Sequence, residues 1–264
     1  MLSSFIDLPF QTSYRIDTNC QDLISSLQLM YGDYIKISEQ KTDYKIKAIK
    51  SDALYNVYSA ENFCTTKYPL QELNKIIFDN TVYDDCVFAL HGSAVEWNGK
   101  AYGFLASTTS GKTTLASYLA SCGFNYIADD CILLKRDDFK IYPYSTPIHL
   151  RDGGLEVLKH YDAAPKEVQI LDAGYTKRYV YMPDNCMRNE TPLTHIFFIT
   201  RTESENKIID MSTTERMTEL LKAPITDYRV TGAYLKFISE VAKIKCNRLL
   251  YSDMAYVAEA IRHG

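Results

Sequence analysis

The sequence predicts an α/β fold, in which a mixed sheet with flanking helices follows a small β-rich layer. Three observations favour it. A strand-like apolar run at 101–105 leads through a short polar loop into a helical run at 113–121. Segment 194–200 carries the continuous apolar run Ile196-Phe197-Phe198-Ile199, as expected for a strand buried at the centre of a sheet. Residues 1–60 alternate loosely in short stretches, which is typical of a mostly antiparallel sheet.

Composition limits the kind of protein. The 264 residues are 46% hydrophobic and 23% charged, which is ordinary for a globular chain. The net charge of −4 shows no basic surplus, so nucleic acid is not expected as a partner. The seven cysteines form no C-x-x-C pair, which indicates reduced thiols rather than a zinc site. No signal peptide or membrane span is evident, so a cytoplasmic location is expected, and a homo-oligomer remains open.

We expect two parts, a small N-terminal β-rich region at 1–80 and a second domain at 81–264. The expected elements of the first part are strands at 14–16, 34–37 and 44–49 and helices at 19–29 and 69–80. A long strand at 85–97 then turns at Asn98-Gly99, because both residues of this dipeptide accept positive φ, and returns as the strand that enters the loop. This arrangement places His91 on the strand antiparallel to the loop strand.

After the loop helix, Gly123 marks a stop, and 124–128 is expected to be a strand next to the loop strand and parallel to it. That strand ends in Asp129-Asp130. The remaining expected elements are strands at 131–134, 140–144, 177–182, 194–200 and 246–251 and helices at 155–161, 212–222, 230–244 and 254–262. Ser212 and Glu215 form a capping-box pattern at the start of one of these helices.

The loop itself ends in Gly111-Lys112-Thr113, the ending of a phosphate-binding loop. A tight loop before a helix points backbone N–H groups into one concavity, Lys112 can reach terminal phosphates, and the Thr113 hydroxyl can bind Mg²⁺. The full pattern begins with Gly where this chain has Ala106, which fits only at negative φ. An ordinary strand–turn–helix with an accidental match is the alternative. The predicted nucleotide-binding residues are Thr108, Thr109, Ser110, Gly111, Lys112, Thr113 and Thr114.

Asp129 and Asp130 are expected at the carboxyl edge of the sheet, where ligands bind in open α/β folds. One carboxylate can hold Mg²⁺ and the other can accept the proton of an attacking hydroxyl. His91 could orient that carboxylate. A turn pair and a half-buried strand histidine are the alternatives. The charged residues that could bind phosphate or an acidic peptide, or be solvated, are Arg151, Lys177 and Arg178.

At these residues the sequence resembles the HPr kinase family, in the compact form found with peptide-modifying gene clusters. The residues that carry the resemblance are Leu90-His91-Gly92, Asn98-Gly99, Ser110-Gly111-Lys112-Thr113-Thr114-Leu115-Ala116, Gly123, Ala128-Asp129-Asp130, Pro143 and Pro147-Ile148-His149-Leu150-Arg151. The resemblance implies a P-loop kinase core similar to phosphoenolpyruvate carboxykinase. It also implies transfer of the γ-phosphate of ATP, or of another nucleoside triphosphate, to a serine hydroxyl of a peptide or protein.

The resemblance also implies roles for single residues. Lys112 and Thr113 would hold phosphate and Mg²⁺, Asp129 would be the general base, Asp130 would lie near the metal, and His91 would contact the base. A serine of a ribosomal precursor peptide is the acceptor that the compact relatives suggest. Thr114 stands where the bifunctional enzymes usually carry Glu, and their downstream glycine-rich signature is missing, so neither reverse dephosphorylation nor HPr as the substrate is expected.

Two other functions remain open from the sequence. The acceptor could be a small metabolite such as free serine, or the chain could be a regulatory module that binds a nucleotide without turnover. The residue at Ala106 is the best support for the regulatory module. A carboxykinase is disfavoured because no His/Lys metal set is visible.

Overall fold

The computed structural model describes residues 1–8, 12–36, 41–60, 62–82, 87–107, 109–172, 177–223 and 232–264. The chain divides into two compact units. Unit 1 comprises Met1–Asp84, Thr146–Asp152 and Pro165–Met182, and unit 2 comprises Asp85–Ser145, Gly153–Ala164 and Pro183–Gly264. Unit 1 therefore includes two later segments that the predicted division at 80/81 assigned to the second domain. No helix in the described ranges is long and apolar enough to cross a membrane.

Unit 1 contains a six-stranded sheet in the order β3-β1-β2-β4-β5-β6. Its strands are β1 (Leu2–Asp7), β2 (Ser13–Thr18), β3 (Ile35–Lys36), β4 (Tyr44–Ser51), β5 (Leu54–Tyr58) and β6 (Phe63–Thr66), and its helices are α1 (Gln21–Tyr31) and α2 (Pro69–Val82). All neighbouring pairs are antiparallel except β2 and β4, which confirms the mostly antiparallel sheet. The Tyr14 hydroxyl donates to the Ile77 carbonyl and ties α2 to the sheet.

The two later segments of unit 1 form a separate three-stranded sheet. Its strands are β13 (Ile148–Leu150), β14 (Gln169–Asp172) and β15 (Lys177–Tyr181), with β15 in the middle. Pro147 and Met182 lie against Gly32 of the N-terminal segment. Such long-range pairing leaves no local signal, which explains why the sequence predicted a single boundary.

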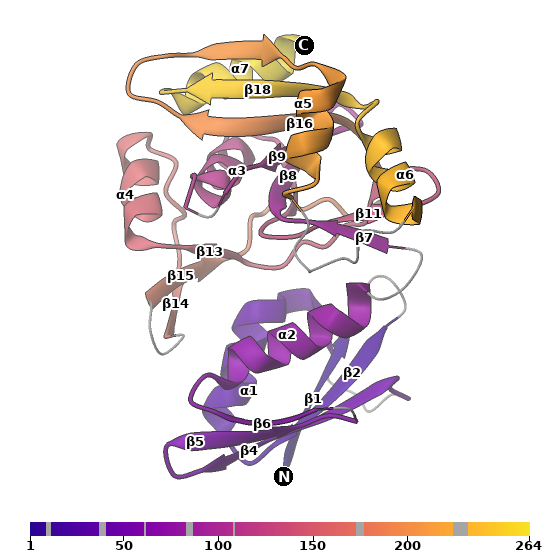
Figure 1. Cartoon of the computed structure of the whole chain (residues 1–264). Coiled ribbons are helices and arrows are strands. Elements are labelled where there is room, and N and C mark those ends of the chain that lie inside the picture. The colour runs from indigo at the N-terminus through magenta and orange to yellow at the C-terminus, as the bar shows by residue number, and fades with distance from the viewer. Residues whose placement is uncertain are drawn as a thin grey trace. The chain divides into compact units, whose positions relative to one another are not determined.

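Unit 2 is built around a mixed sheet in the order β10-β8-β9-β16-β12-β11-β7, with β18 on β16 and β17 on β18. Figure 1 shows β18 alongside β16. The strands are β7 (Val87–Leu90), β8 (Gly92–Trp97), β9 (Lys100–Leu105), β10 (Asn125–Ala128), β11 (Ile132–Lys135), β12 (Lys140–Ile141), β16 (Thr191–Arg201), β17 (Lys207–Asp210) and β18 (Lys245–Tyr251). β16 runs parallel to both β9 and β18, so these three strands end at the same edge. Its central place confirms the expectation from the apolar run.

The helices of unit 2 are α3 (Lys112–Ser121), α4 (Asp152–His160), α5 (Thr213–Leu220), α6 (Gly232–Val241) and α7 (Met254–His263). Alternate residues of a strand point to opposite faces. Ile196 and Phe198 of β16 share one buried cluster with Leu220 of α5 and Ile238 of α6. Helix α3 packs on β8 and β10, and α7 packs on α3 and β18. The overall class is thus mixed α/β, as predicted.

The long strand expected at 85–97 is wrong in one respect, because it breaks at His91. β7 pairs with β11 and β8 pairs with β9, so the two halves join different parts of the sheet. The break falls where Gly92 approaches the loop strand. A Cβ on Gly92 would lie 2.5 Å from Leu105 Cδ2 and 2.7 Å from the Phe104 carbonyl oxygen. His91 therefore lies at a bend, not on the strand antiparallel to β9.

The strand that ends in the Asp pair also differs from expectation. β10 pairs with β8, antiparallel, so it runs in the direction of β9 but does not neighbour it. The Asn98-Gly99 turn, with φ of 51° and 77°, folds β8 back along one side of β9, and β16 occupies the other side. The hairpin that the sequence predicted correctly thus displaces the strand that was expected next to β9.

We expect Gly92→Ala to lower the free energy of unfolding by about 1–3 kcal/mol, because the added methyl group overpacks the contact with Leu105 and the Phe104 carbonyl. Denaturant unfolding measures this. Gly153→Ala in α4 is the matched control, since nothing lies within 4 Å of its added Cβ and alanine favours a helix. Equal stability of the two variants would contradict the close-approach explanation.

Candidate active site

The loop between β9 and α3 meets the requirement set by Ala106 and holds Thr109 in a strained conformation. Ala106 is not among the residues with positive φ, so it meets the condition set by its Cβ. Thr109 and Gly111 take the left-handed region, with φ of 68° and 89°. A non-glycine residue there costs about 1–3 kcal/mol, a strain typical of functional loops. Gly111 is further restricted because a Cβ would lie 3.2 Å from the Tyr251 hydroxyl. Thr108, a predicted binding residue, lies outside the described residues.

Lys112 is the first residue of α3, and its side chain folds back into the loop. The residue is 5% exposed, and its Nζ donates to the carbonyl oxygens of Ala106 and Ser107 at 2.9 and 3.0 Å. The Ser110 hydroxyl donates to the Ser107 carbonyl at 2.6 Å and closes the turn. Burial lowers the pKa of Lys112, and the nearby carboxylates of Asp130 and Asp129 oppose that shift. The charge of Lys112 is thus held beside the Asp pair.

Asp129 is a buried carboxyl group directly after β10. Its Oδ1 accepts a hydrogen bond from the Ser93 hydroxyl at 2.6 Å, and the Thr113 hydroxyl also hydrogen bonds to the carboxyl group. Burial, followed by the charge of Asp130, raises the pKa of Asp129 to about 7, while the two hydroxyl bonds act in the opposite direction. A carboxyl group with this pKa is half ionised near neutral pH, which suits proton transfer.

His91 contacts the neighbour of this carboxyl group rather than the group itself. Its Nδ1 lies 3.0 Å from the carbonyl oxygen of Asp130, and its backbone N–H donates to the Ala223 carbonyl at 2.6 Å. Burial and the charge of Lys112 lower the pKa of His91, so its neutral form is favoured at neutral pH. Asp130 itself has φ of 60°, a left-handed turn that His91 steadies. The resemblance implied a contact with Asp129, and the structure shows one to Asp130.

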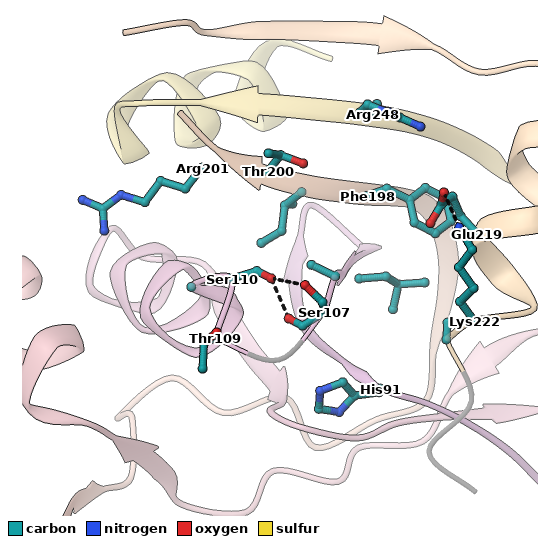
Figure 2. A pocket seen from close by; sticks show the side chains of 15 residues that line it. His91, Ser107, Thr109, Ser110, Phe198, Thr200, Arg201, Glu219, Lys222 and Arg248 are labelled. Carbon is teal, nitrogen blue, oxygen red and sulfur yellow. Dashed lines mark hydrogen bonds and ion pairs between the residues drawn. The ribbon is translucent and has the colours of Figure 1, made fainter. Parts of the chain in front are cut away.

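A pocket of about 980 Å³ opens over the loop (Figure 2). Its polar and charged lining residues are His91, Ser107, Thr109, Ser110, Thr200, Arg201, Glu219, Lys222 and Arg248. The sequence reasoning missed the last five of these. Arg201 ends β16, which is parallel to β9, so its place at the carboxyl edge was a usable signal once that pairing was known. Arg248 lies inside a strand and carried no such signal.

Three predicted substrate residues lie elsewhere in the chain. Arg151, Lys177 and Arg178 belong to unit 1, whereas the loop belongs to unit 2. Lys177 lies over the Tyr179 ring with its Nζ 4.8 Å from the ring centroid. A role for these three residues in substrate binding stays a prediction.

The side chains at the site determine whether Mg²⁺ can bind there. The described residues contain no group of three or more His, Cys, Asp or Glu side chains that could hold a metal ion. Mg²⁺ in phosphoryl-transfer sites is held by one or two carboxylates together with the phosphates of the substrate, rather than by a cage of protein ligands. The Thr113 hydroxyl bound to Asp129, with Asp130 adjacent, fits that donor set.

Of the comparisons with known proteins, the one with solved structures gave a match. No protein-family model and no curated protein matches the chain. Among solved structures, the HPr(Ser) kinase/phosphatase from Coxiella burnetii is similar at 11% identity and a TM-score of 0.31, over 66% of this chain and 93% of that one. A likeness of this size establishes neither fold family nor activity. The function is therefore inferred from the geometry of the site.

We expect Ser93→Ala to raise the pKa of Asp129 further, because the hydroxyl bond that favours the carboxylate is lost. If Asp129 acts as the base, the acidic limb of the pH–rate profile then moves to higher pH. Ser121→Ala, at the far end of α3, is the control. An unchanged limb in Ser93→Ala would show that another group sets the profile.

Proposed function

We propose that unit 2 is a phosphotransferase that moves the γ-phosphate of ATP, or of another nucleoside triphosphate, to a hydroxyl group. The acceptor in this proposal is a serine of a peptide or protein. One observation supports it above the others. The buried Asp129 carboxyl, with its pKa raised to about 7, hydrogen bonds Thr113 on the helix that begins at Lys112. A base tuned to neutral pH thus lies beside a loop of phosphate-binding sequence.

The proposed reaction uses these groups as follows. The ionised Asp129 accepts the proton of the acceptor hydroxyl as that oxygen forms a bond to the γ-phosphorus. The bond from the γ-phosphorus to the bridging oxygen breaks, and its electron pair leaves with the nucleoside diphosphate. Lys112 exchanges its two loop carbonyls for phosphate oxygens, which bind an ammonium group more strongly than neutral carbonyls do.

Mg²⁺ would be held by Thr113 and Asp130 together with the phosphates. When bound, it neutralises the negative charge that the phosphates carry. His91 acts as a positioning residue in this proposal, because it holds the Asp130 carbonyl and so the turn that carries both carboxylates.

The motif pattern of the compact HPr-kinase-like proteins supports the same reaction. A precursor peptide as acceptor and a cytoplasmic location are parts of the proposal that rest on the sequence alone.

A second candidate, a regulatory module that binds a nucleotide without turnover, is favoured by one observation. Lys112 is fully engaged with the carbonyls of its own loop, a conformation that nucleotide binding has to break.

Mass spectrometry of serine-containing peptides, incubated with the protein, ATP and Mg²⁺, tests the proposal. Phosphorylated peptide that disappears when Mg²⁺ is chelated is the expected result. Tight ATP binding in calorimetry, with neither transfer nor hydrolysis, would favour the regulatory module instead.

A further inference from the structure

The pocket extends from the loop to β16, to β18 and to the end of α5 in unit 2. Phe198 of β16 and Arg248 of β18 are register partners in the parallel ladder, so their side chains lie next to each other on the same face. Glu219 and Lys222, near the end of α5, line the same part of the pocket. We call the part lined by Phe198, Glu219, Lys222 and Arg248 the β18 arm.

The β18 arm is connected to the Asp pair through His91. The backbone N–H of His91 donates to the carbonyl of Ala223, the residue after Lys222, and its ring contacts the Asp130 carbonyl. His91 and Ala223 both line the pocket as well. The arm and the turn that carries Asp130 and Asp129 therefore both adjoin His91. Asp129, the base of the proposed reaction, precedes Asp130 in this turn.

The charged side chains in and near the arm differ in whether an oppositely charged partner neutralises them. Lys222 forms an ion pair with Glu219 at 3.1 Å. The carboxylate of Glu215 accepts from the Ser212 N–H and hydroxyl at 2.8 and 2.7 Å, and these bonds are the main reason that the pKa of Glu215 is lowered. The charge of Arg248 lowers it further. Within the described part of the chain, the side chain of Arg248 has no hydrogen bond or ion pair. The arm thus offers one exposed, unpaired guanidinium next to the apolar surface of Phe198.

We propose that the β18 arm binds the acceptor and that the acceptor carries a carboxylate near its hydroxyl group, recognised by Arg248. The inference rests on the proposed phosphotransferase function. A guanidinium binds a carboxylate through two parallel hydrogen bonds, which gives it both affinity and orientation. In the proposed reaction Lys112 and the loop amides hold the nucleotide phosphates, which leaves the arm for the acceptor. The carboxylate belongs either to an acidic residue of a peptide or to a small hydroxy acid.

Acceptor kinetics with designed substrates test the inference. The peptides carry one serine flanked by Asp, Gly or Lys, and free serine is compared with serinamide. We expect kcat/KM for the Asp-flanked peptide to exceed that for the Gly-flanked peptide about tenfold or more, the scale of a hydrogen bond to a charged group. Free serine preferred over serinamide would identify a small hydroxy acid, and it would support the inference equally.

Variants of Arg248 show whether this residue distinguishes acidic from neutral acceptors. Arg248→Ala is expected to bring the acidic-to-neutral ratio close to one, and Arg248→Glu to shift preference toward the Lys-flanked peptide. Lys243→Ala is the matched control, an exposed lysine that pairs with Glu240 on α6, and it keeps the preference. Because Arg248 is exposed, its replacement leaves the core intact.

Different results would overturn the proposed phosphotransferase function and the inference about its acceptor. Transfer that is indifferent to acceptor charge, or a preference that survives in Arg248→Ala, overturns the inference and leaves the phosphotransferase standing. ATP binding without transfer to any acceptor overturns the proposed function, and the inference with it.

Discussion

Asp129→Asn is expected to lower turnover by about a hundredfold or more while nucleotide binding stays nearly unchanged, the usual scale for loss of a general base. The amide oxygen of asparagine can still accept the hydrogen bond from Ser93, and the side chain has the shape of aspartate but cannot take a proton. Phosphate transfer under saturating ATP measures turnover, and calorimetry measures binding. In the wild type, turnover should rise as the pH passes through about 7, where Asp129 loses its proton.

Asp137→Asn is the matched control, because Asp137 belongs to the turn between β11 and β12. It should behave like the wild type in both assays. Turnover in Asp129→Asn equal to that of the wild type would remove Asp129 from the role of base. The same loss in both variants would point to a general effect on folding.

The free energy of unfolding gives a second test of Asp129→Asn that does not depend on turnover. The pKa of Asp129 is raised from 3.8 to about 7 in the folded chain, so the native state keeps a proton that the unfolded chain releases between these pH values. The wild type therefore loses stability as the pH rises through this window, by up to a few kcal/mol. Asparagine does not titrate. The variant should gain stability relative to the wild type between pH 4 and pH 8, measured by denaturant unfolding.

Lys112→Ala is the second change with a large expected effect. Removing the ammonium group should lower turnover about a hundredfold to a thousandfold, the range for loss of one preorganised electrostatic contact to the transition state. It should also weaken ATP binding, because the terminal phosphates lose their cation. Calorimetry with ATP and Mg²⁺, together with the transfer assay, measures both effects.

Two further variants make the Lys112 result interpretable. Lys112→Met keeps most of the buried stem without the charge, which separates loss of the cation from loss of packing. Lys159→Ala removes an exposed lysine of the Glu156 pair on α4 and should leave both assays unchanged. Wild-type ATP binding in Lys112→Met would show that the loop does not bind phosphate through this residue.

Local signals in the sequence predicted the local structure well. Asn98-Gly99 takes the positive φ values of a tight hairpin, and Ser212 and Glu215 form the full capping box of α5. Each of these depends on residues within a few positions of one another. The apolar run in β16 predicted that the strand is buried, because a strand covered on both faces carries apolar side chains on both of them.

Features set by distant residues could not be predicted. The bend at His91 depends on Gly92 meeting Leu105 and Phe104 across the ladder, and the place of β10 depends on which side β8 occupies. Arg248 enters the pocket because of its register with Phe198 on another strand. The candidate site was therefore predicted where it follows one strand–loop–helix unit, and missed where later strands complete the pocket.

Transfer of label from γ-labelled ATP in a single turnover, with protein in excess over nucleotide, tests the central claim most directly. Wild type and Lys112→Ala are compared with Mg²⁺ and a serine-containing peptide mixture. Label on the peptide with the wild type, and its loss in the variant, is the predicted result. Tight binding of ATP by the wild type with all label retained in the nucleotide would contradict a phosphotransferase.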